Sequence, residues 1–210
     1  MQENIAKILD FMCAMERVCL VKRDTLLSDG TTETDAAHIF KLAFLVMLVY
    51  PYLKKKYNYT RLLELALVHD IPEGLTGDLP RSTQVAHPES KIEKMQQEQK
   101  AMHIYKKMLP VPLNDRISEL FNEYEAKETL EAKLVSVLDK MEANLQANRF
   151  GNGDIRYWQD CDNGTEYYRI ATAKKALVKE LDEDILTELE HKIITLTKEN
   201  ISRCKIEVCL

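Results

Sequence analysis

Residues 65–80 read LALVHDIPEGLTGDLP, and this stretch decides how the rest of the chain is interpreted. An apolar run with helical spacing ends in the adjacent polar pair His69 and Asp70, and Pro72 and Gly74 then interrupt the helix. Apolar residues lie one turn before both members of the pair, so the helix carries an imidazole and a carboxylate on its apolar side. A buried, unpaired carboxylate is costly, and we therefore expect Asp70 to have a compensating partner.

Two other predicted helices also carry residues of the types that bind metals on the side that faces the interior. His38 shares a helical face with Leu42 and Val49, and Asp139 lies at the edge of an apolar arc into which Glu142 projects. Alone, each residue has an ordinary alternative: a hydrogen-bonded core histidine, or an aspartate in a salt bridge. Two imidazoles and two carboxylates together suit a borderline divalent ion, with positions left open for water and substrate.

The composition predicts a helical protein. The chain has 210 residues, of which 45% are apolar and only six each are Gly and Pro. We expect an all-α fold in which residues 1–210 form a single domain, with a core over about 30–150 and C-terminal helices over about 151–210 packed on it. The expected helices cover residues 2–20, 35–49, 60–70, 88–109, 114–150 with a break near Lys127, and 167–200. Thr32 or Thr34 should cap the second helix, and residues 22–34 should form a long loop of the kind that often carries function.

Charge, cysteine content and hydropathy exclude several classes of protein. A net charge of −5 and a pI near 5.6 argue against a polynucleotide partner, which selects a basic surface. Five cysteines without C-x-x-C spacing predict neither a zinc ribbon nor a disulfide framework, so a reducing, cytoplasmic location fits. The apolar stretch of residues 42–53 is shorter than the roughly 20 residues that span a bilayer. We therefore expect a buried core helix there and no membrane partner.

The order His38, His69-Asp70, Asp139 resembles the H…HD…D signature of the HD-domain phosphohydrolases. The similarity is to the branch of bacterial 5'-deoxynucleotidases and their eukaryotic HD-domain relatives. A more specific feature is the HD-x-x-E-x-x-x-GD spacing, which runs here from His69 to Asp78. The family is also matched at Glu33, at Lys94 with Glu98, and at EAKLVSVLDKMEANLQA, residues 131–147. Together the matching parts cover about three quarters of the chain.

The resemblance implies an HD-domain helical bundle with one divalent metal ion between core helices, held by His38, His69, Asp70 and Asp139. The ion would be manganese, cobalt, zinc, iron or magnesium. The resemblance also implies that Glu73 is the general base that takes a proton from the attacking water. The substrate would be a nucleoside 5'-monophosphate, cleaved to nucleoside and phosphate, and the protein would be a homodimer.

Candidate substrate-binding residues follow from the same resemblance. Asp78 is similar to the active-site residue that holds the sugar, and Arg81 lies just beyond it. Arg23 resembles the arginine that grips the phosphate, although Lys22 could serve instead because the loop that follows differs in length from the family's. Lys94 is a further candidate for substrate contact; the alternative is a surface ion pair with an acidic residue one helical turn away.

One departure from the family concerns sugar selection. The family's deoxynucleotidases resemble each other in placing a tryptophan directly after the phosphate-gripping arginine, where it can crowd a ribose 2'-hydroxyl, whereas this chain has Asp24 and Thr25. The chain's tryptophan, Trp158, lies in an irregular segment, residues 151–165, where it either forms part of a lid or pins that segment to the core. Two alternatives stay open. One is an HD phosphohydrolase that acts on another phosphoester, such as a cyclic nucleotide, a nucleoside triphosphate or a phosphorylated metabolite; the other is a module that senses a nucleotide without turning it over.

Overall fold

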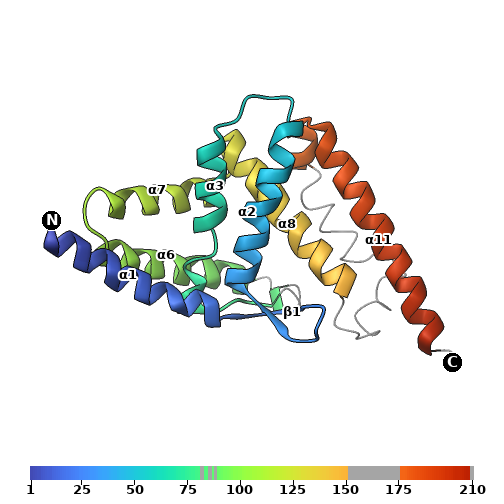
Figure 1. The fold of residues 1–210 in the computed structure, drawn as a ribbon, viewed down its shortest axis with the longest axis horizontal. Coiled ribbons are helices and arrows are strands. Elements are labelled where there is room, and N and C mark those ends of the chain that lie inside the picture. The colour runs from blue at the N-terminus through green and yellow to red at the C-terminus, as the bar shows by residue number, and fades with distance from the viewer. Residues whose placement is uncertain (81–82, 85–86, 88, 151–175, 209–210) are drawn as a thin grey trace.

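Helices arranged around α8 make up most of the fold (Figure 1). The computed structural model describes residues 1–80, 83–84, 87, 89–150 and 176–208. Its elements in chain order are α1 (Gln2–Leu20), β1 (Lys22–Leu26), β2 (Thr32–Thr34), α2 (Asp35–Val49), η1 (Tyr50–Tyr52), α3 (Tyr59–Val68), α4 (Glu73–Thr76), α6 (Ser90–Met108), α7 (Leu113–Ala126), α8 (Leu130–Phe150) and α11 (Asp184–Val208). Residues 176–181 form a further helical segment before α11. The expected helical fold is confirmed, with a small β1–β2 hairpin added to it.

The core surrounds α8, which packs against α2, α3, α7 and α11. The apolar face of α8 follows the expected arc, because Leu134, Val135 and Leu138 are almost completely buried. Leu42 of α2 and Leu65 of α3 are buried in the same cluster. Burial of one such side chain stabilises a fold by about 1.5–3 kcal/mol relative to exposure. Packing of this kind fixes the angles at which the three helices present their polar residues.

Residues 22–34, expected to form a loop, instead contain an antiparallel hairpin. The register pairs Lys22 with Thr34 and Leu26 with Thr32. The turn is closed by Asp29, whose carboxylate accepts hydrogen bonds from the backbone N–H (2.9 Å) and the hydroxyl (2.6 Å) of Thr31. The sequence did not predict these strands because it lacks alternating apolar residues: the inward positions hold Thr25 and Glu33.

Local sequence signals set several helix ends as expected. Thr34 caps α2, since its hydroxyl accepts the backbone N–H of Ala37 at 3.3 Å. The expected break near Lys127 is present, because this residue adopts φ 51° and ends α7. A further left-handed residue, Asp182 with φ 53°, interrupts the continuous helix that the sequence predicts over residues 167–200. Aspartate tolerates this conformation better than most residues do.

One face of α2 is exposed, so the expectation of a buried helix over residues 42–53 is only half correct. The exposed side chains on this face include Phe40, Phe44, Met47 and Leu48. Among the described residues, Asp35–Tyr52 is the one span that could cross a bilayer by length and composition, with 33% of it buried. The other face packs on α3 and α8. The helix is therefore a core helix on one side only.

A buried carboxylate joins the C-terminal helices to the turn between α2 and α3. Glu183 accepts hydrogen bonds from the backbone N–H groups of Lys54 (2.6 Å) and Lys55 (3.0 Å) and from the hydroxyl of Tyr57 (3.1 Å). Beyond it, α11 packs along α8 (Figure 1). Trp158 lies outside the described residues, so its role and the boundaries of a single domain stay predictions.

Candidate metal centre

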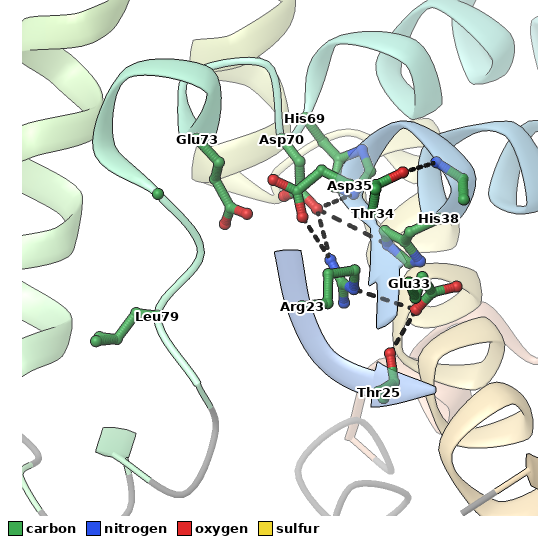
Figure 2. Close-up of polar contacts among 12 residues, drawn as sticks. Arg23, Thr25, Glu33, Thr34, Asp35, His38, His69, Asp70, Glu73 and Leu79 are labelled. Carbon is green, nitrogen blue, oxygen red and sulfur yellow. Dashed lines mark hydrogen bonds and ion pairs between the residues drawn. The ribbon is translucent and has the colours of Figure 1, made fainter. Parts of the chain in front are cut away.

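Three helices bring the expected metal ligands to one point. His38 comes from α2, His69 and Asp70 directly follow α3, and Asp139 comes from α8. Donor atoms of His38, His69 and Asp139 all lie within 4.8 Å of one another, and the three side chains are buried. Asp70 Oδ2 lies 3.0 Å from His69 Nε2 and 3.8 Å from His38 Nε2 (Figure 2). The structure therefore brings together all four residues that the sequence predicts as metal ligands.

One ring nitrogen of His69 faces this centre. Its Nδ1 lies 2.9 Å from the carbonyl oxygen of Ala66, which can only accept, so Nδ1 carries a proton and Nε2 is the nitrogen left to face the centre. This Nε2 is buried without a hydrogen-bond partner, although Asp70 Oδ2 is 3.0 Å away. A ring nitrogen and a carboxylate oxygen this close need a positive charge between them, which a metal ion would supply. The donor set therefore fits a borderline divalent ion.

Charges around the centre shift the pKa values of its members. Burial and Arg23 disfavour the charged form of His38, but hydrogen bonds to two carboxylates outweigh them and raise its pKa to about 9. Burial alone would raise the pKa of Asp70, yet the imidazoles of His69 and His38 hold it well below its usual range. The pKa of Asp139 is also lowered, against its burial, by the adjacent lysine and by His38. Both carboxylates are therefore anionic, as ligands of a cation must be.

Tyr124 of α7 covers one side of the centre. Its hydroxyl donates a 2.8 Å hydrogen bond to Asp139 Oδ2, and its ring centroid lies 5.1 Å from that of His69. The bond leaves Asp139 Oδ1, which is 3.2 Å from His38 Nε2, facing the centre. Burial, followed by the charge of Asp139, raises the pKa of Tyr124, so the hydroxyl keeps its proton. Sequence reasoning missed Tyr124, because its position on α7 resembles that of an ordinary core aromatic residue.

The hairpin places Arg23 beside the same centre (Figure 2). Its Nη1 lies 3.5 Å from Asp70 Oδ2 and 3.4 Å from Asp35 Oδ1, and its Nε lies 3.4 Å from Glu33 Oε2. Burial would lower the pKa of Arg23, but the neighbouring carboxylates, Asp70 first among them, raise it. The alternative residue, Lys22, is exposed at the start of β1. The geometry therefore favours Arg23 over Lys22 as a cation for an anionic substrate.

A second group of carboxylates lies next to Arg23. Oxygens of Asp35, Glu73 and Asp78 lie within 4.8 Å of one another and could also hold a cation. Asp35 Oδ2 and Glu73 Oε2 are buried without hydrogen-bond partners. Burial, followed by the charge of Asp70, raises the pKa of Glu73 to about 10 and that of Asp35 to about 6. Burial likewise raises the pKa of Asp78. Sequence reasoning missed Asp35, which reads as an ordinary acidic residue in the first turn of a helix.

Lys94 contacts Glu73 and does not form a simple surface pair. Its Nζ lies 2.5 Å from Glu73 Oε1 and 3.3 Å from Glu98 Oε1. Glu73 is only 2% exposed and Glu98 is also buried, so α6 brings a cation into a partly enclosed acidic site. Direct contact between Lys94 and a substrate stays a prediction. Arg81 lies outside the described residues, and its expected role is likewise untested.

Comparisons with known sequences agree with this arrangement. A sequence profile of the HD domain matches residues 15–182. The chain is 36% identical over 115 residues to the 5'-deoxynucleotidase HDDC2 of Xenopus laevis, and the alignment covers 55% of this chain and 54% of that protein. It is 34% identical over 152 residues to the 5'-deoxynucleotidase hdd1 of Schizosaccharomyces pombe, with 68% and 73% covered. The chain thus spans about half the length of the Xenopus relative.

Solved structures extend the likeness along the chain. One, described as a predicted metal-dependent phosphohydrolase from Magnetospirillum magnetotacticum, has a TM-score of 0.70 at 25% identity and covers 96% of this chain and 97% of that chain. Another, a conserved hypothetical protein from Pyrococcus furiosus, has a TM-score of 0.61 at 24% identity and covers 87% and 99%. The second likeness shows the shared fold alone.

Proposed function

We propose that this chain, which belongs to the HD-domain family, is a metal-dependent phosphomonoesterase that converts nucleoside 5'-monophosphates to nucleoside and phosphate. One observation carries the proposal: four side chains of metal-ligand types converge beside a partly buried arginine and a buried glutamate. The relatives that the chain resembles are named 5'-deoxynucleotidases, which supports a nucleotide as the substrate.

One divalent ion would be held by His38, His69, Asp70 and Asp139. Bound there, a manganese, cobalt, zinc, iron or magnesium ion would polarise a phosphoryl oxygen and acidify a water molecule. The unpartnered Nε2 of His69 and the lowered pKa values of Asp70 and Asp139 support this assignment. Two nitrogen and two oxygen donors suit several of these ions, which is why the test below includes all five.

Glu73 is the proposed general base. It accepts a proton from the attacking water while the water oxygen bonds to phosphorus and the bond from phosphorus to the 5' oxygen breaks. The departing 5' oxygen takes up a proton, for which Asp78 is the proposed donor, since burial raises its pKa. Only ionised Glu73 can act as a base. Without metal, burial outweighs Lys94, 2.5 Å from Oε1, and holds the pKa of Glu73 at about 10, so the ionised form would depend on the added positive charge of the bound ion.

Arg23 and Asp78 are proposed to hold opposite ends of the nucleotide. The planar fork of Arg23 would bind phosphate oxygens, and Asp78 would bind a sugar hydroxyl. Arg81 and Lys94 are further proposed contacts. Thr25 is turned toward a carboxylate of β2, to which it donates a 2.6 Å hydrogen bond. Asp24, directly after Arg23, also has no ring that could crowd a ribose as the family's tryptophan would, and we expect both ribonucleotides and deoxyribonucleotides to be substrates.

We expect the working form of the protein to be a cytoplasmic homodimer, as the family resemblance implies. Its net charge of −5 supports a small nucleotide rather than a polynucleotide as the partner. Light scattering behind size-exclusion chromatography tests the dimer. A mass of twice 24.3 kDa is expected, and a mass of 24.3 kDa would contradict it.

Phosphate release from a panel of ribonucleoside and deoxyribonucleoside 5'-monophosphates tests the proposed reaction. Metal-stripped protein is assayed with each of the five ions, beside the variants Glu73→Ala and Glu119→Ala. We expect turnover to depend on an added ion, to be abolished by Glu73→Ala, and to survive Glu119→Ala, which changes an exposed carboxylate of α7. Full turnover in Glu73→Ala would remove Glu73 from the mechanism. No turnover with any ion, together with a tightly bound nucleotide on the purified protein, would favour a sensing module.

A further inference from the structure

Behind the metal centre lies a line of paired charged side chains, three of which the proposed reaction does not use. Nδ1 of His38 lies 2.5 Å from Glu142 Oε2, and Oε1 of the same glutamate lies 2.7 Å from the ammonium of Lys41. Lys41 also pairs with Glu33 Oε1. The other oxygen, Glu33 Oε2, lies 3.4 Å from Arg23 Nε. Unbroken contacts thus run from a proposed metal ligand to the proposed phosphate-binding arginine.

The two carboxylates in this line are buried, and buried charges need partners. Glu33 is 0% exposed and Glu142 is 5% exposed. Lys41 pairs with both, although one lies on β2 and the other on α8. Further hydrogen bonds hold the line in place: Thr25 Oγ1 donates to Glu33 at 2.6 Å, and Lys41 donates to Gln146 Oε1 at 2.7 Å. Because desolvated charges are costly unless satisfied in this way, the geometry is held by more than one contact at each point.

At one end of the line, Glu142 decides which nitrogen of His38 is available. An ionised carboxylate only accepts hydrogen bonds, so Nδ1 carries a proton and Nε2 is the nitrogen that turns toward Asp70 and Asp139. Metal-binding histidines commonly donate their other ring N–H to a carboxylate, which fixes the tautomer and the orientation of the ring. Glu142 occupies that place here.

At the other end, Glu33 decides how Arg23 is turned. Its Oε2 faces the Nε edge of the guanidinium, and Nη1 then lies on the side of Asp70 (Figure 2). A guanidinium is planar, so fixing one edge fixes the direction of the others. Sequence reasoning matched Glu33 to the family without assigning it a role.

We propose that Glu142, Lys41 and Glu33, called here the positioning chain, set His38 for a divalent ion and Arg23 for a phosphate. They are positioning residues, since each acts through another side chain. Lys41 joins the two ends because a single ammonium neutralises both carboxylates. The role of Glu33 in phosphate binding rests on the proposed function. The role of Glu142 in metal binding depends only on the four converging candidate ligands.

Manganese binding tests the metal end without any substrate. Metal-stripped protein is titrated with Mn²⁺, and the electron paramagnetic resonance signal of the free ion gives the affinity. Glu142→Ala should weaken Mn²⁺ binding about 10–100-fold, and Glu142→Gln should recover much of that loss, because its amide oxygen still accepts from Nδ1. A folded Glu142→Ala protein with wild-type affinity would overturn this end of the proposal.

Inorganic phosphate tests the other end, by calorimetry on manganese-saturated protein. Glu33→Gln should weaken phosphate binding about tenfold, because it removes the negative charge that pairs with the Nε edge of Arg23, and should change Mn²⁺ affinity by less than about threefold. Lys41→Met should weaken both. Should that variant fail to fold by circular dichroism, the double variant Glu33→Gln/Glu142→Ala takes its place and should weaken the binding of both ligands. Wild-type phosphate affinity in Glu33→Gln, in Lys41→Met or in the double variant would overturn the proposal.

Two controls separate this proposal from simpler explanations. Glu183→Gln changes another buried carboxylate with three hydrogen bonds, so it should lower stability while both affinities stay at the wild-type value. Equal losses of affinity in Glu183→Gln would overturn the positioning role in favour of a general effect of stability. Nucleotide hydrolysis by the wild-type protein is measured in parallel. Absent turnover would contradict the proposed function only, because the Mn²⁺ titrations still decide the metal end.

Discussion

Replacement of Glu183 by alanine should loosen the C-terminal helices from the core. The carboxylate is 1% exposed and accepts hydrogen bonds from the backbone N–H groups of Lys54 (2.6 Å) and Lys55 (3.0 Å) and from the hydroxyl of Tyr57 (3.1 Å). Alanine leaves three donors without their acceptor. At about 1–1.5 kcal/mol for each, the free energy of unfolding should fall by about 3–4.5 kcal/mol. That is a large share of the roughly 5–15 kcal/mol that stabilises a typical domain.

Urea unfolding followed by far-UV circular dichroism measures this loss. With a slope of about 2–3 kcal/mol per molar urea, the midpoint should fall by about 1–2 M. Asp184→Ala is the matched control, because Asp184 is the next residue and pairs with the side chain of Lys54 at 2.6 Å, but its own side chain is 80% exposed. Its midpoint should equal that of the wild type. Equal midpoints for the two variants would show that buried Glu183 stabilises the protein no more than exposed Asp184 does, which would contradict this prediction.

Three further predictions concern the site. Gly74→Ala places a Cβ 2.9 Å from both the hydroxyl of buried Tyr105 and Cγ2 of Val18, so thermal unfolding should show a loss of about 1–3 kcal/mol. Without metal, the pKa of Glu73 is raised from 4.5 to about 10; between these values the folded protein holds a proton that the unfolded chain has released, so stability falls as pH rises. For one proton, the free energy of unfolding should fall by about 1.4 kcal/mol per pH unit. Glu73→Gln should remove this pH dependence from urea midpoints measured in EDTA between about pH 6 and pH 8. An unchanged pH dependence in the variant would contradict the raised pKa. Asp24→Trp should raise the ratio of kcat/KM for deoxyribonucleotides over ribonucleotides about tenfold, and an unchanged ratio would show that this position does not read the sugar.

Local patterns were sufficient to predict that most of the candidate ligands face the interior. His38, His69 and Asp139 were each expected to face the interior from their spacing relative to apolar residues, and all three are buried. The cap at Thr34 and the helix end at Lys127 are also where the sequence predicts them. Such features depend on residues within one or two helical turns, so one sequence is enough to find them.

Contacts between distant segments had no comparable signal in the sequence. Lys94 lies four residues before Glu98, which predicts a surface pair, yet packing of α6 against α4 brings it to Glu73, 21 residues away in the chain. The pairing of Lys41 with both Glu33 and Glu142 likewise depends on how the hairpin and α8 meet α2. Tertiary packing decides these contacts, and the spacing of the residues along the chain does not report it.

His38, His69, Asp70 and Asp139 are proposed to hold one divalent ion. Anomalous diffraction from crystals grown with Mn²⁺ can locate that ion without reference to activity. We expect a peak about 2.0–2.3 Å from Nε2 of both histidines and from an oxygen of each aspartate. A peak confined to the group of Asp35, Glu73 and Asp78, or none among these side chains in crystals of protein that binds Mn²⁺ in solution, would contradict it.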